Sequence, residues 1–487
     1  MYTFKTKPYT HQLEAFNSSW KAPYHALFME MGTGKTKVIL DSLGALFEAK
    51  EVTHALIVAP KGVFDNWVQG EIPLHLPDRI KRLVVRWQPN FTKKYEEQLL
   101  DVAVPDRREP DTLNILVMNI EALSTKKGTT VASRFLQINP ANMMVIDEST
   151  TIKNRTALRT KNVLRCAKLA KYRRILTGSP ITKSPMDLFT QCAFLSSKAL
   201  GFESYYSFQN RYAIVKRRIM GAKSFNEVVG FQRLDELTVK LDAFSTRVLK
   251  ENCLDLPPKV YVQRRVELTA EQAKLYHQMS EYALAQLEDG KLATTVNILT
   301  QIMRLHQITC GHFQPDDNAP IESLKNNRLP ELLSICEELQ GKAIIWATWT
   351  HDITQIAQAL RDRFGNEAVA TYHGATLQDQ RQLIVSRFQD PADPLRFFVG
   401  QPSTGGYGIT LTAANTVIYF SNSYNLEHRL QSEDRAHRIG QTKSVTYIDL
   451  ITPKTVDGKI LTALRAKINI AATVLGEDVL DWLVEKK

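Results

Sequence analysis

The chain has 487 residues, of which 44% are hydrophobic and 23% are charged. Its length allows roughly two to four domains, and its composition is ordinary for a globular protein. No apolar run approaches about 18 residues, and the opening MYTFKTKPYTHQ has no apolar signal segment, so we expect neither a membrane span nor export. The 62 lysines and arginines exceed the 51 acidic residues, which gives a formal net charge of +11. This excess favours a polyanionic partner, and a basic but merely solvated surface is the alternative.

The cysteines indicate a reducing compartment. All five stand apart in the sequence and form no CxxC pair, as is typical of reduced thiols. Cys310 and His312 lie near His306, but this spacing matches no common zinc motif, so we predict no metal-binding cluster there.

Apolar runs along the chain predict two parallel sheets. Short, β-branched runs recur between charge-rich segments of helical character, first at 54–60, 113–119, 142–148 and 173–178, and then at 342–348, 396–401, 416–420 and 444–450. Buried strands that alternate with helices form parallel sheets covered on both faces. We therefore predict an α/β protein with two such sheets.

A stretch of different character separates the two sets of strands. Residues 185–250 are rich in aromatic and basic side chains, and we interpret them as a mostly helical protrusion. The proline pair in DLPPKV then breaks the pattern, because proline cannot continue a helix. We place the domain boundary near 250, which gives a first domain at 1–250 and a second at 251–487, with a helical insertion near 269–310.

The segment MEMGTGKTK lies between an apolar run and a helical run and has the character of a phosphate loop. Gly32 and Gly34 allow the backbone to curl so that amide N–H groups point at phosphate oxygens, and the following helix adds the positive end of its dipole. Lys35 would then reach the β- and γ-phosphates of a nucleotide, and Thr36 would ligate Mg²⁺. The full motif has another glycine where this chain has Met29.

An acidic pair complements this loop. In VIDEST, apolar residues lead into Asp147 and Glu148, which places both acids at the carboxyl end of a strand, where parallel sheets bind ligands. Asp147 can hold Mg²⁺ through water, and Glu148 can orient and deprotonate an attacking water. The alternative is a pair of surface acids at a strand end.

The segment QSEDRAHRIGQ offers two arginines, Arg435 and Arg438, which we expect one helical turn apart on one helix face. A guanidinium fork matches phosphate oxygens and can stabilise the charge that develops during hydrolysis. If these arginines come from a second lobe, the site is complete only when the lobes close, which would couple hydrolysis to movement. The alternative is an exposed amphipathic helix with ion pairs.

In this order, the segments resemble the motifs of the Swi/Snf-type family of superfamily-two helicase-fold ATPases over about residues 8–465. The resemblance rests on YTHQLEAF, MEMGTGKT, ALIVAPKGVFDNW, VIDEST with the following IKN, LTGSPI, DLPPK, TYHGAT, RFQD, STGGYGITLTAANTVIYF and QSEDRAHRIGQ. The ending HRIGQ is the most specific of them. The resemblance implies two RecA-like lobes with parallel sheets and mostly helical insertions, DNA-stimulated hydrolysis of ATP with Mg²⁺, and movement along duplex DNA.

The resemblance also implies roles for individual positions. Gln12 is the expected reader of adenine, and the nucleotide contacts fall on Gln12, Gly32, Thr33, Gly34, Lys35, Thr36, Gly406 and Gly408. DNA contacts fall on Lys61, Lys153, Asn154, Thr404 and Thr410. Coupling between the two sites falls on Thr177, Gly178, Ser179 and Gln431.

Other positions allow two interpretations. The basic run Lys216, Arg217 and Arg218 could add a DNA contact from a protrusion or form a solvated face. Trp67 and Tyr407 could stack on unpaired bases or belong to the core.

The chain departs from the family at Thr150, where the acidic motif usually ends in histidine. Threonine can form hydrogen bonds but cannot carry charge, so the coupling of DNA binding to hydrolysis could differ. We find no segment that resembles an appended chromatin-reading or nuclease module, as in a minimal prokaryotic or phage enzyme. We expect a cytoplasmic monomer, associated with the nucleoid in a bacterium or present in the host cytoplasm for a phage.

Three functions remain open from the sequence. The first is a translocase that moves on duplex or branched DNA and remodels DNA structures or protein–DNA complexes. The second is a helicase that separates strands or migrates branches at forks and junctions, which would need a wedge that the sequence does not declare. The third is an ATP-gated DNA clamp with weak hydrolysis, for which Thr150 is the sole support.

Overall fold

The computed structural model describes residues 2–61, 63–104, 107, 109–220, 223–288, 295–315, 319–405 and 409–475. The chain divides into two compact units. The first contains Met1–Ile214 and Gly230–Asp255 together with the last turns of the final helix, and the second contains Val215–Val229 and Leu256–Asn469. One of the passages of the chain between the units follows Asp255, and the boundary predicted from the sequence lies near 250.

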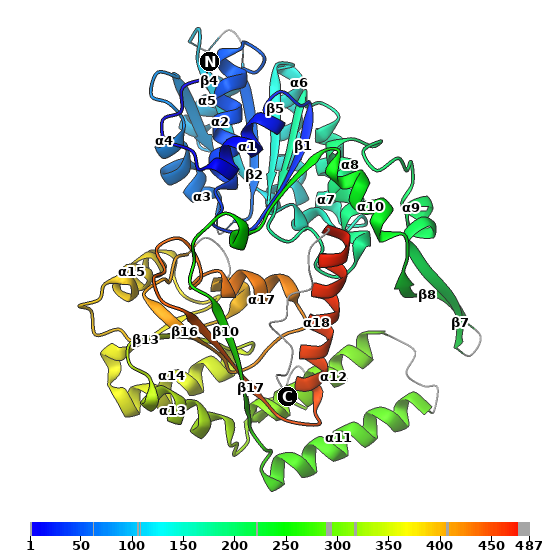
Figure 1. Cartoon of the computed structure of the whole chain (residues 1–487), viewed down its shortest axis with the longest axis vertical. Coiled ribbons are helices and arrows are strands. Elements are labelled where there is room, and N and C mark those ends of the chain that lie inside the picture. Colours follow the sequence, from blue (N-terminus) through cyan, green and yellow to red (C-terminus); the bar gives the residue numbers. More distant parts are fainter. Residues whose placement is uncertain are drawn as a thin grey trace. The chain divides into compact units, whose positions relative to one another are not determined.

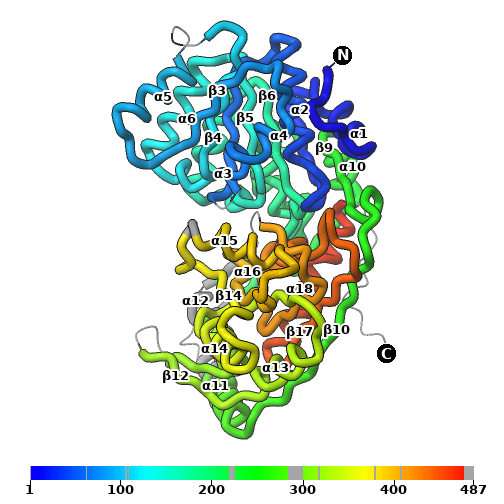
Figure 2. The backbone as a smooth tube through the Cα atoms, turned by 90° about the vertical axis from the view of Figure 1, so that its left-hand side faces the viewer, coloured from blue at the N-terminus to red at the C-terminus, as the bar shows by residue number. Residues whose placement is uncertain are grey.

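The first unit is built on a parallel sheet of seven strands. Their order is β3 (Arg82–Arg86), β4 (Leu113–Asn119), β2 (His54–Ala59), β5 (Asn142–Asp147), β6 (Tyr172–Leu176), β1 (Tyr24–Met29) and β9 (Ser245–Val248). Each neighbouring pair runs parallel, and Figure 2 shows the sheet running from β3 to β9. The apolar runs of the sequence form its central strands, which are buried along almost their whole length.

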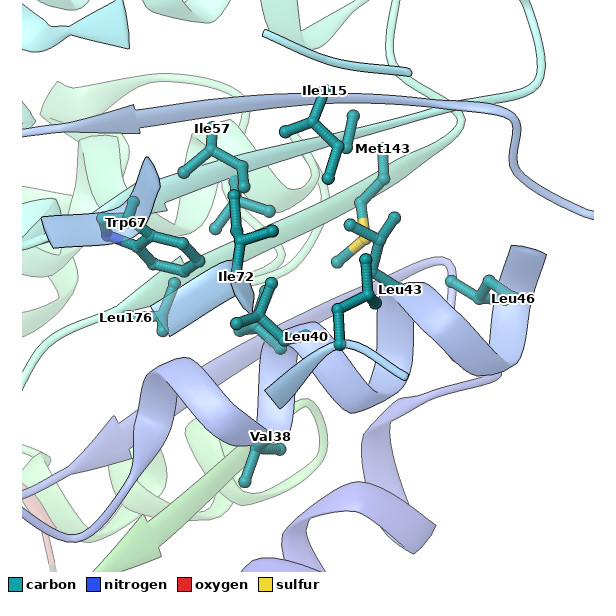
Figure 3. Close-up of a cluster of buried hydrophobic side chains, with 14 of the residues drawn as sticks. Val38, Leu40, Leu43, Leu46, Ile57, Trp67, Ile72, Ile115, Met143 and Leu176 are labelled. Carbon is teal, nitrogen blue, oxygen red and sulfur yellow. The ribbon is translucent and has the colours of Figure 1, made fainter. Parts of the chain in front are cut away.

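Helices cover both faces of this sheet (Figure 1). They are α1 (Thr10–Ser19), α2 (Lys35–Glu48), α3 (Phe64–Asn66), the π-helix η1 (Trp67–Glu71), α4 (Ile72–His75), α5 (Lys93–Ala103), η3 (Ile120–Ser124), α6 (Lys126–Ile138), η4 (Ser149–Ile152) and α7 (Leu158–Ala167). In Figure 3, Leu40 and Leu43 of α2 pack with Ile57, Ile115 and Met143 of the strands in one buried cluster. This cluster holds α2, whose first residue is Lys35, firmly against the sheet.

The segment predicted to be a mostly helical protrusion contains three short α-helices and two strands. The helices are α8 (Leu188–Leu195), α9 (Tyr205–Tyr212) and α10 (Leu234–Asp242), with the 3₁₀ turns η5 (Pro185–Asp187) and η6 (Lys250–Asn252). Between α9 and α10, the strands β7 (Ala213–Met220) and β8 (Lys223–Phe231) form a separate two-stranded sheet (Figure 1). The helical prediction is therefore wrong for these strands, because the β-branched residues of AIVKRRIM and KSFNEVVGF favour extended backbone.

The second unit has a parallel sheet of six strands. Their order is β10 (Lys259–Arg265), β17 (Val445–Ile451), β16 (Ala414–Tyr419), β13 (Lys342–Trp346), β15 (Phe397–Gly400) and β14 (Val369–Tyr372). All neighbouring pairs are parallel. Ile345 packs in a cluster on one face and Ile344 in a cluster on the other, as alternation along a strand requires. The two parallel sheets confirm the predicted α/β class.

The helices of the second unit complete its layers. They are α11 (Ala270–Glu288), α12 (Thr295–Cys310), α13 (Arg328–Glu338), α14 (Thr350–Phe364), η7 (Asn366–Ala368), α15 (Gln378–Gln389), α16 (Pro402–Gly405), α17 (Leu426–Glu433) and α18 (Val456–Leu475). The short strands β11 (His312–Phe313) and β12 (Glu322–Ser323) pair antiparallel. The helical insertion predicted near 269–310 coincides with α11 and α12. Among the described residues, no helix is both long and apolar enough to cross a membrane.

Candidate nucleotide site

The first unit brings the ends of several strands to one edge of its sheet. β5, β6, β1 and β9 lie side by side and run parallel, so their carboxyl ends share that edge. The glycine-rich loop follows Met29 of β1, the acidic pair begins at Asp147 of β5, and LTGSPI begins at Leu176 of β6. This is the edge at which parallel α/β sheets bind ligands.

The glycine-rich loop has the backbone shape of a phosphate-binding turn. Gly32 and Gly34 have positive φ values of 80° and 88°, which side chains with a Cβ rarely allow. Helix α2 begins directly after Gly34, so its unbonded amides and the positive end of its dipole follow the loop. The buried Lys35 Nζ donates to the carbonyl oxygens of Met29 and Glu30 at 2.8 and 3.2 Å. Neutral carbonyls thus hold an ammonium that phosphate oxygens could bind instead.

Helix α1 supports this loop. Gln12 Nε2 donates to the carbonyl oxygen of Thr33 at 3.0 Å, and His11 Nε2 lies 2.8 Å from the same oxygen. Gln12 Oε1 also accepts the amide of Tyr9. A Cβ at Gly34 would lie 2.2 Å from Gln12 Nε2, so glycine is required there for space as well as for φ. Gln12, the predicted reader of adenine, here holds the loop, and nothing in the sequence signalled that His11 helps.

Asp147 is buried and held from two directions. Its Oδ2 accepts the indole N–H of Trp67 at 2.9 Å, and its Oδ1 accepts the amide of Glu148 at 3.0 Å. Burial raises the pKa of Asp147, while the Trp67 hydrogen bond and the positive charge of Lys35 oppose this rise. Trp67 is 1% exposed and lies among core side chains (Figure 3), so its ring is not available to stack on a base. Sequence reasoning did not foresee that Trp67 binds the acidic motif.

Glu148 and the segment LTGSPI meet beside the loop. Glu148 has a φ of 49°, a left-handed conformation that costs on the order of 1–3 kcal/mol in a residue other than glycine. Thr177 Oγ1 lies 3.5 Å from its carboxylate and also accepts the amide of Ser179. A Cβ on Gly178 would lie 3.2 Å from the amide nitrogen of Met31, so β6 ends in direct contact with the phosphate loop. The three predicted coupling residues of the first unit therefore lie between the loop and the acidic pair.

In the second unit, the two arginines converge without sharing a helix. α17 ends at Glu433, so Arg435 and Arg438 lie in the turn that follows, and the prediction of one helix face is wrong. The carbonyl of Arg435 accepts the amide of Leu411, which ties this backbone to a neighbouring segment where a helix would have continued. Both guanidinium groups nevertheless donate to one oxygen, the carbonyl of Ile409, at 3.0 and 3.3 Å.

A buried ion cluster fixes the helix that precedes these arginines. Arg429 contacts Glu433 at 2.7 Å and Asp449 at 2.5 Å, and all three side chains are buried. Glu433 also accepts hydrogen bonds from Lys259 at 3.2 Å and from the hydroxyl of Tyr261 at 2.8 Å. Burial alone would raise the pKa of Glu433, but Lys259 and Arg429 lower it overall. Glu433, one of the two acids in QSEDRAHR, therefore makes its contacts within its own unit.

Of the predicted DNA contacts of the first unit, Lys153 lies beside LTGSPI. Lys153 Nζ donates to Thr182 Oγ1 at 2.6 Å, just beyond the end of that segment. Asn154 is exposed, and its side-chain oxygen accepts the amide of Thr156. Lys61 is exposed in the turn after β2.

The remaining predicted positions belong to the second unit. Thr404 lies in α16, and Thr410 lies between the undescribed segment and β16. The backbone carbonyl of Gln431 accepts the Nε of Arg435 at 2.9 Å, which connects this coupling position to the arginine turn. Three predicted residues lie outside the described part of the chain: Gly406, Tyr407 and Gly408.

The first unit has residues that suit the phosphates of a nucleotide and residues that suit its Mg²⁺ ion. The loop amides and Lys35 would face phosphates, and Thr36 and Asp147 would face Mg²⁺. Among the residues that the structure describes, no group of three or more His, Cys, Asp or Glu could hold a metal ion. A nucleotide-bound Mg²⁺ is compatible with this, since it takes most of its ligands from phosphates and water.

The chain is therefore an α/β protein with two parallel sheets, in which a glycine-rich turn before a helix and an acidic pair lie at the same edge of the first sheet. The family model for the SNF2-related domain matches residues 21–314, and the model for the helicase conserved C-terminal domain matches residues 324–440. The chain belongs to the SNF2-related family.

Curated relatives come from eukaryotes and bacteria. The SWI/SNF chromatin-remodeling complex subunit snf22 of Schizosaccharomyces pombe is 28% identical over 463 residues, which is 92% of this chain and 26% of that protein. The "Uncharacterized ATP-dependent helicase MG018" of Mycoplasma genitalium is 27% identical over 457 residues, which is 92% of this chain and 40% of that protein. The chain thus spans between about a quarter and two fifths of the length of these relatives.

A solved structure is also similar. The Sulfolobus solfataricus SWI2/SNF2 ATPase core in complex with dsDNA is 24% identical, with a TM-score of 0.43, and the match covers 99% of this chain and 98% of that one.

Proposed function

We propose that the chain is an ATP-driven motor that moves along double-stranded DNA. The observation that carries the proposal is the contact of three elements at one sheet edge: the phosphate loop, the acidic pair and LTGSPI. The net charge of +11 and the family's ATP-dependent helicases support DNA as the partner.

The residues divide the chemistry between them. Lys35, which donates to two loop carbonyls here, would bind phosphate oxygens instead, while Thr36 and Asp147 would hold Mg²⁺. When bound, Mg²⁺ would supply positive charge against the charge that develops on the phosphates. Glu148 orients the attacking water and accepts its proton. Arg435 and Arg438, which both donate to the carbonyl of Ile409 here, would supply the positive charge that the γ-phosphate needs during hydrolysis.

LTGSPI carries the coupling between the ATP site and DNA. Thr177 lies at the carboxylate of Glu148, and Thr182 accepts a hydrogen bond from Lys153, a proposed phosphate contact. Gly178 contacts the phosphate loop between these two points. A shift of this short segment on DNA binding therefore moves the backbone beside both the loop and the catalytic acid. Thr150, where the family has histidine, is buried in η4 next to the same acid.

Steady-state hydrolysis of ATP tests the proposal. Rates are compared without nucleic acid, with single-stranded DNA, with plain duplex and with a four-way junction. Strong stimulation by plain duplex supports the duplex motor. Stimulation confined to single strands or junctions would favour strand separation or branch migration, and no stimulation would favour an ATP-gated clamp.

A further inference from the structure

The two-stranded sheet of β7 and β8, called here the hairpin, is an arm with basic side chains along one strand. Lys216, Arg217 and Arg218 occupy successive positions of β7 and are all exposed. β8 starts with Lys223, and Glu227 is the single acid in either strand. The two strands form a sheet of their own and project as a narrow ribbon (Figure 1).

The residues that flank the hairpin are tied together by hydrogen bonds. Tyr212, directly before β7, is fully buried, and its hydroxyl donates to Glu236 Oε1 of α10 at 2.9 Å. Arg211 Nε donates to Glu236 Oε2 at 3.0 Å, and its NH2 group contacts the same oxygen. After β8, the amide of Gln232 donates to the carbonyl of Tyr212 at 2.9 Å. An isolated two-stranded sheet is marginally stable in water, so contact with a partner would stabilise the hairpin further.

The charge on the hairpin lies on both of its faces. Successive side chains of a strand point to opposite sides, so Lys216 and Arg218 share one face and Arg217 lies on the other. The exposed aliphatic residues described in the two strands are Ile214, Val228 and Val229, and they are not confined to one face, because Val228 and Val229 are neighbours along β8. Among the side chains that the structure describes here, apolar residues are thus interspersed with basic ones, and this surface suits a partner with negative charge on both sides.

We infer that the hairpin enters the major groove of duplex DNA and contacts the phosphates that flank it; this inference rests on the proposed function. A sheet with its side chains is roughly 10 Å thick, which fits a major groove about 12 Å wide but not a minor groove about 6 Å wide. Arg217 lies three residues before Met220, the last residue of β7, or roughly 10 Å along the strand. The major groove is about 8.5 Å deep. If the end of β7 lies near the floor of the groove, the basic run lies near its rim, at the height of the phosphates.

Binding of the full chain to plain duplex DNA as a function of salt tests this inference. The test variant is Lys216→Ala/Arg217→Ala, which leaves the 2.6 Å ion pair of Arg218 with Glu227 intact. The matched control is Lys93→Ala/Lys94→Ala, which removes two exposed charges from the start of α5. The DNA-free ATPase rate serves as a check that the nucleotide site is unaffected.

The expected change follows from the release of counterions. Each lost phosphate contact lowers the slope of log K against log salt by about 0.9, so the test variant loses about 1.8 in slope and about 30-fold in affinity near 0.15 M salt. The control and the Arg217→Lys variant retain the wild-type slope. Bulky groups at C5 of the pyrimidines fill the major groove, and they should weaken binding by the wild-type chain more than binding by the test variant.

Three outcomes would overturn the inference. An unchanged slope in the test variant, with normal duplex binding by the wild type, would remove the hairpin from the DNA contact while leaving the proposed function intact. Unchanged duplex affinity with lost strand separation on forked DNA would make the hairpin a wedge. Absence of duplex binding by the wild type would defeat the proposed function itself, and the hairpin inference with it.

Discussion

The hydrogen bond from Trp67 to Asp147 gives a quantitative test of the nucleotide site. Trp67→Phe keeps an aromatic ring in the core but removes the donor that lies 2.9 Å from Asp147 Oδ2. A hydrogen bond to a charged group contributes about 1.5–3 kcal/mol. The smaller ring leaves a void of roughly 40 Å³, which costs about 1 kcal/mol. We expect the free energy of unfolding of the first unit to fall by about 2.5–4 kcal/mol at neutral pH.

The pH dependence of this loss has a definite sign. Because burial raises the pKa of Asp147, the folded chain binds a proton on that carboxyl more readily than the unfolded chain does. The stability that this proton adds is present in acid and is lost as the pH rises through the folded pKa. Since Trp67 stabilises mainly the ionised form, the cost of Trp67→Phe should be smaller in acid and larger at neutral pH. The variant should also need more Mg²⁺ for ATP hydrolysis, because a proton competes with the cation.

Native-state hydrogen exchange of the β5 amides reports the stability of the first unit, and ATPase rates against Mg²⁺ report the site. Trp346→Phe is the matched control: Trp346 is fully buried, and its indole N–H has no hydrogen-bond partner among the described residues. Trp346→Phe should lower the free energy of unfolding of the second unit by no more than about 1 kcal/mol at every pH. If the two variants lost equal amounts of unfolding free energy at every pH, the proposed role of the hydrogen bond from Trp67 to Asp147 would be refuted.

Three further predictions concern the same machinery. Gly178→Ala should slow ATP hydrolysis several-fold without unfolding, because its Cβ would lie 3.2 Å from the Met31 amide; Gly374→Ala, whose Cβ meets nothing within 4 Å, should match wild type in the same assay. Glu148→Gln should bind ATP in equilibrium titrations but hydrolyse it poorly, and normal single-turnover rates would exclude Glu148 as the base. Arg438→Ala should lower kcat by about 10³-fold or more, and near-normal turnover would remove it from the γ-phosphate.

The sequence predicts the sheets well because each central strand is buried on both faces. Runs such as HALIVA and NMMVID are continuous and apolar, and they form β2 and β5, which pair parallel as predicted for the sheet. The hairpin had a weaker signal, since its β-branched residues are mixed with charges and follow an aromatic helix. A strand with side chains exposed on both faces does not alternate between apolar and polar residues. The sequence pattern of these strands therefore resembled that of the charged helices around them.

Contacts between distant residues were beyond sequence reasoning. The motif spacing places Arg435 and Arg438 at helical positions, but α17 ends before them, and their convergence depends on the carbonyl of Ile409. Trp67 is separated by 80 positions from Asp147, and only the pairing of β2 with β5 brings the turn after β2 to that acid.

Displacement of the third strand from a DNA triplex by the full chain tests the central claim most directly. The account predicts displacement that requires hydrolysable ATP, shows a longer lag when the duplex before the triplex is longer, and is lost in Glu148→Gln. The duplex strands should remain paired throughout. Duplex-stimulated ATP hydrolysis without displacement, or displacement that needs no hydrolysis, would contradict movement along duplex DNA.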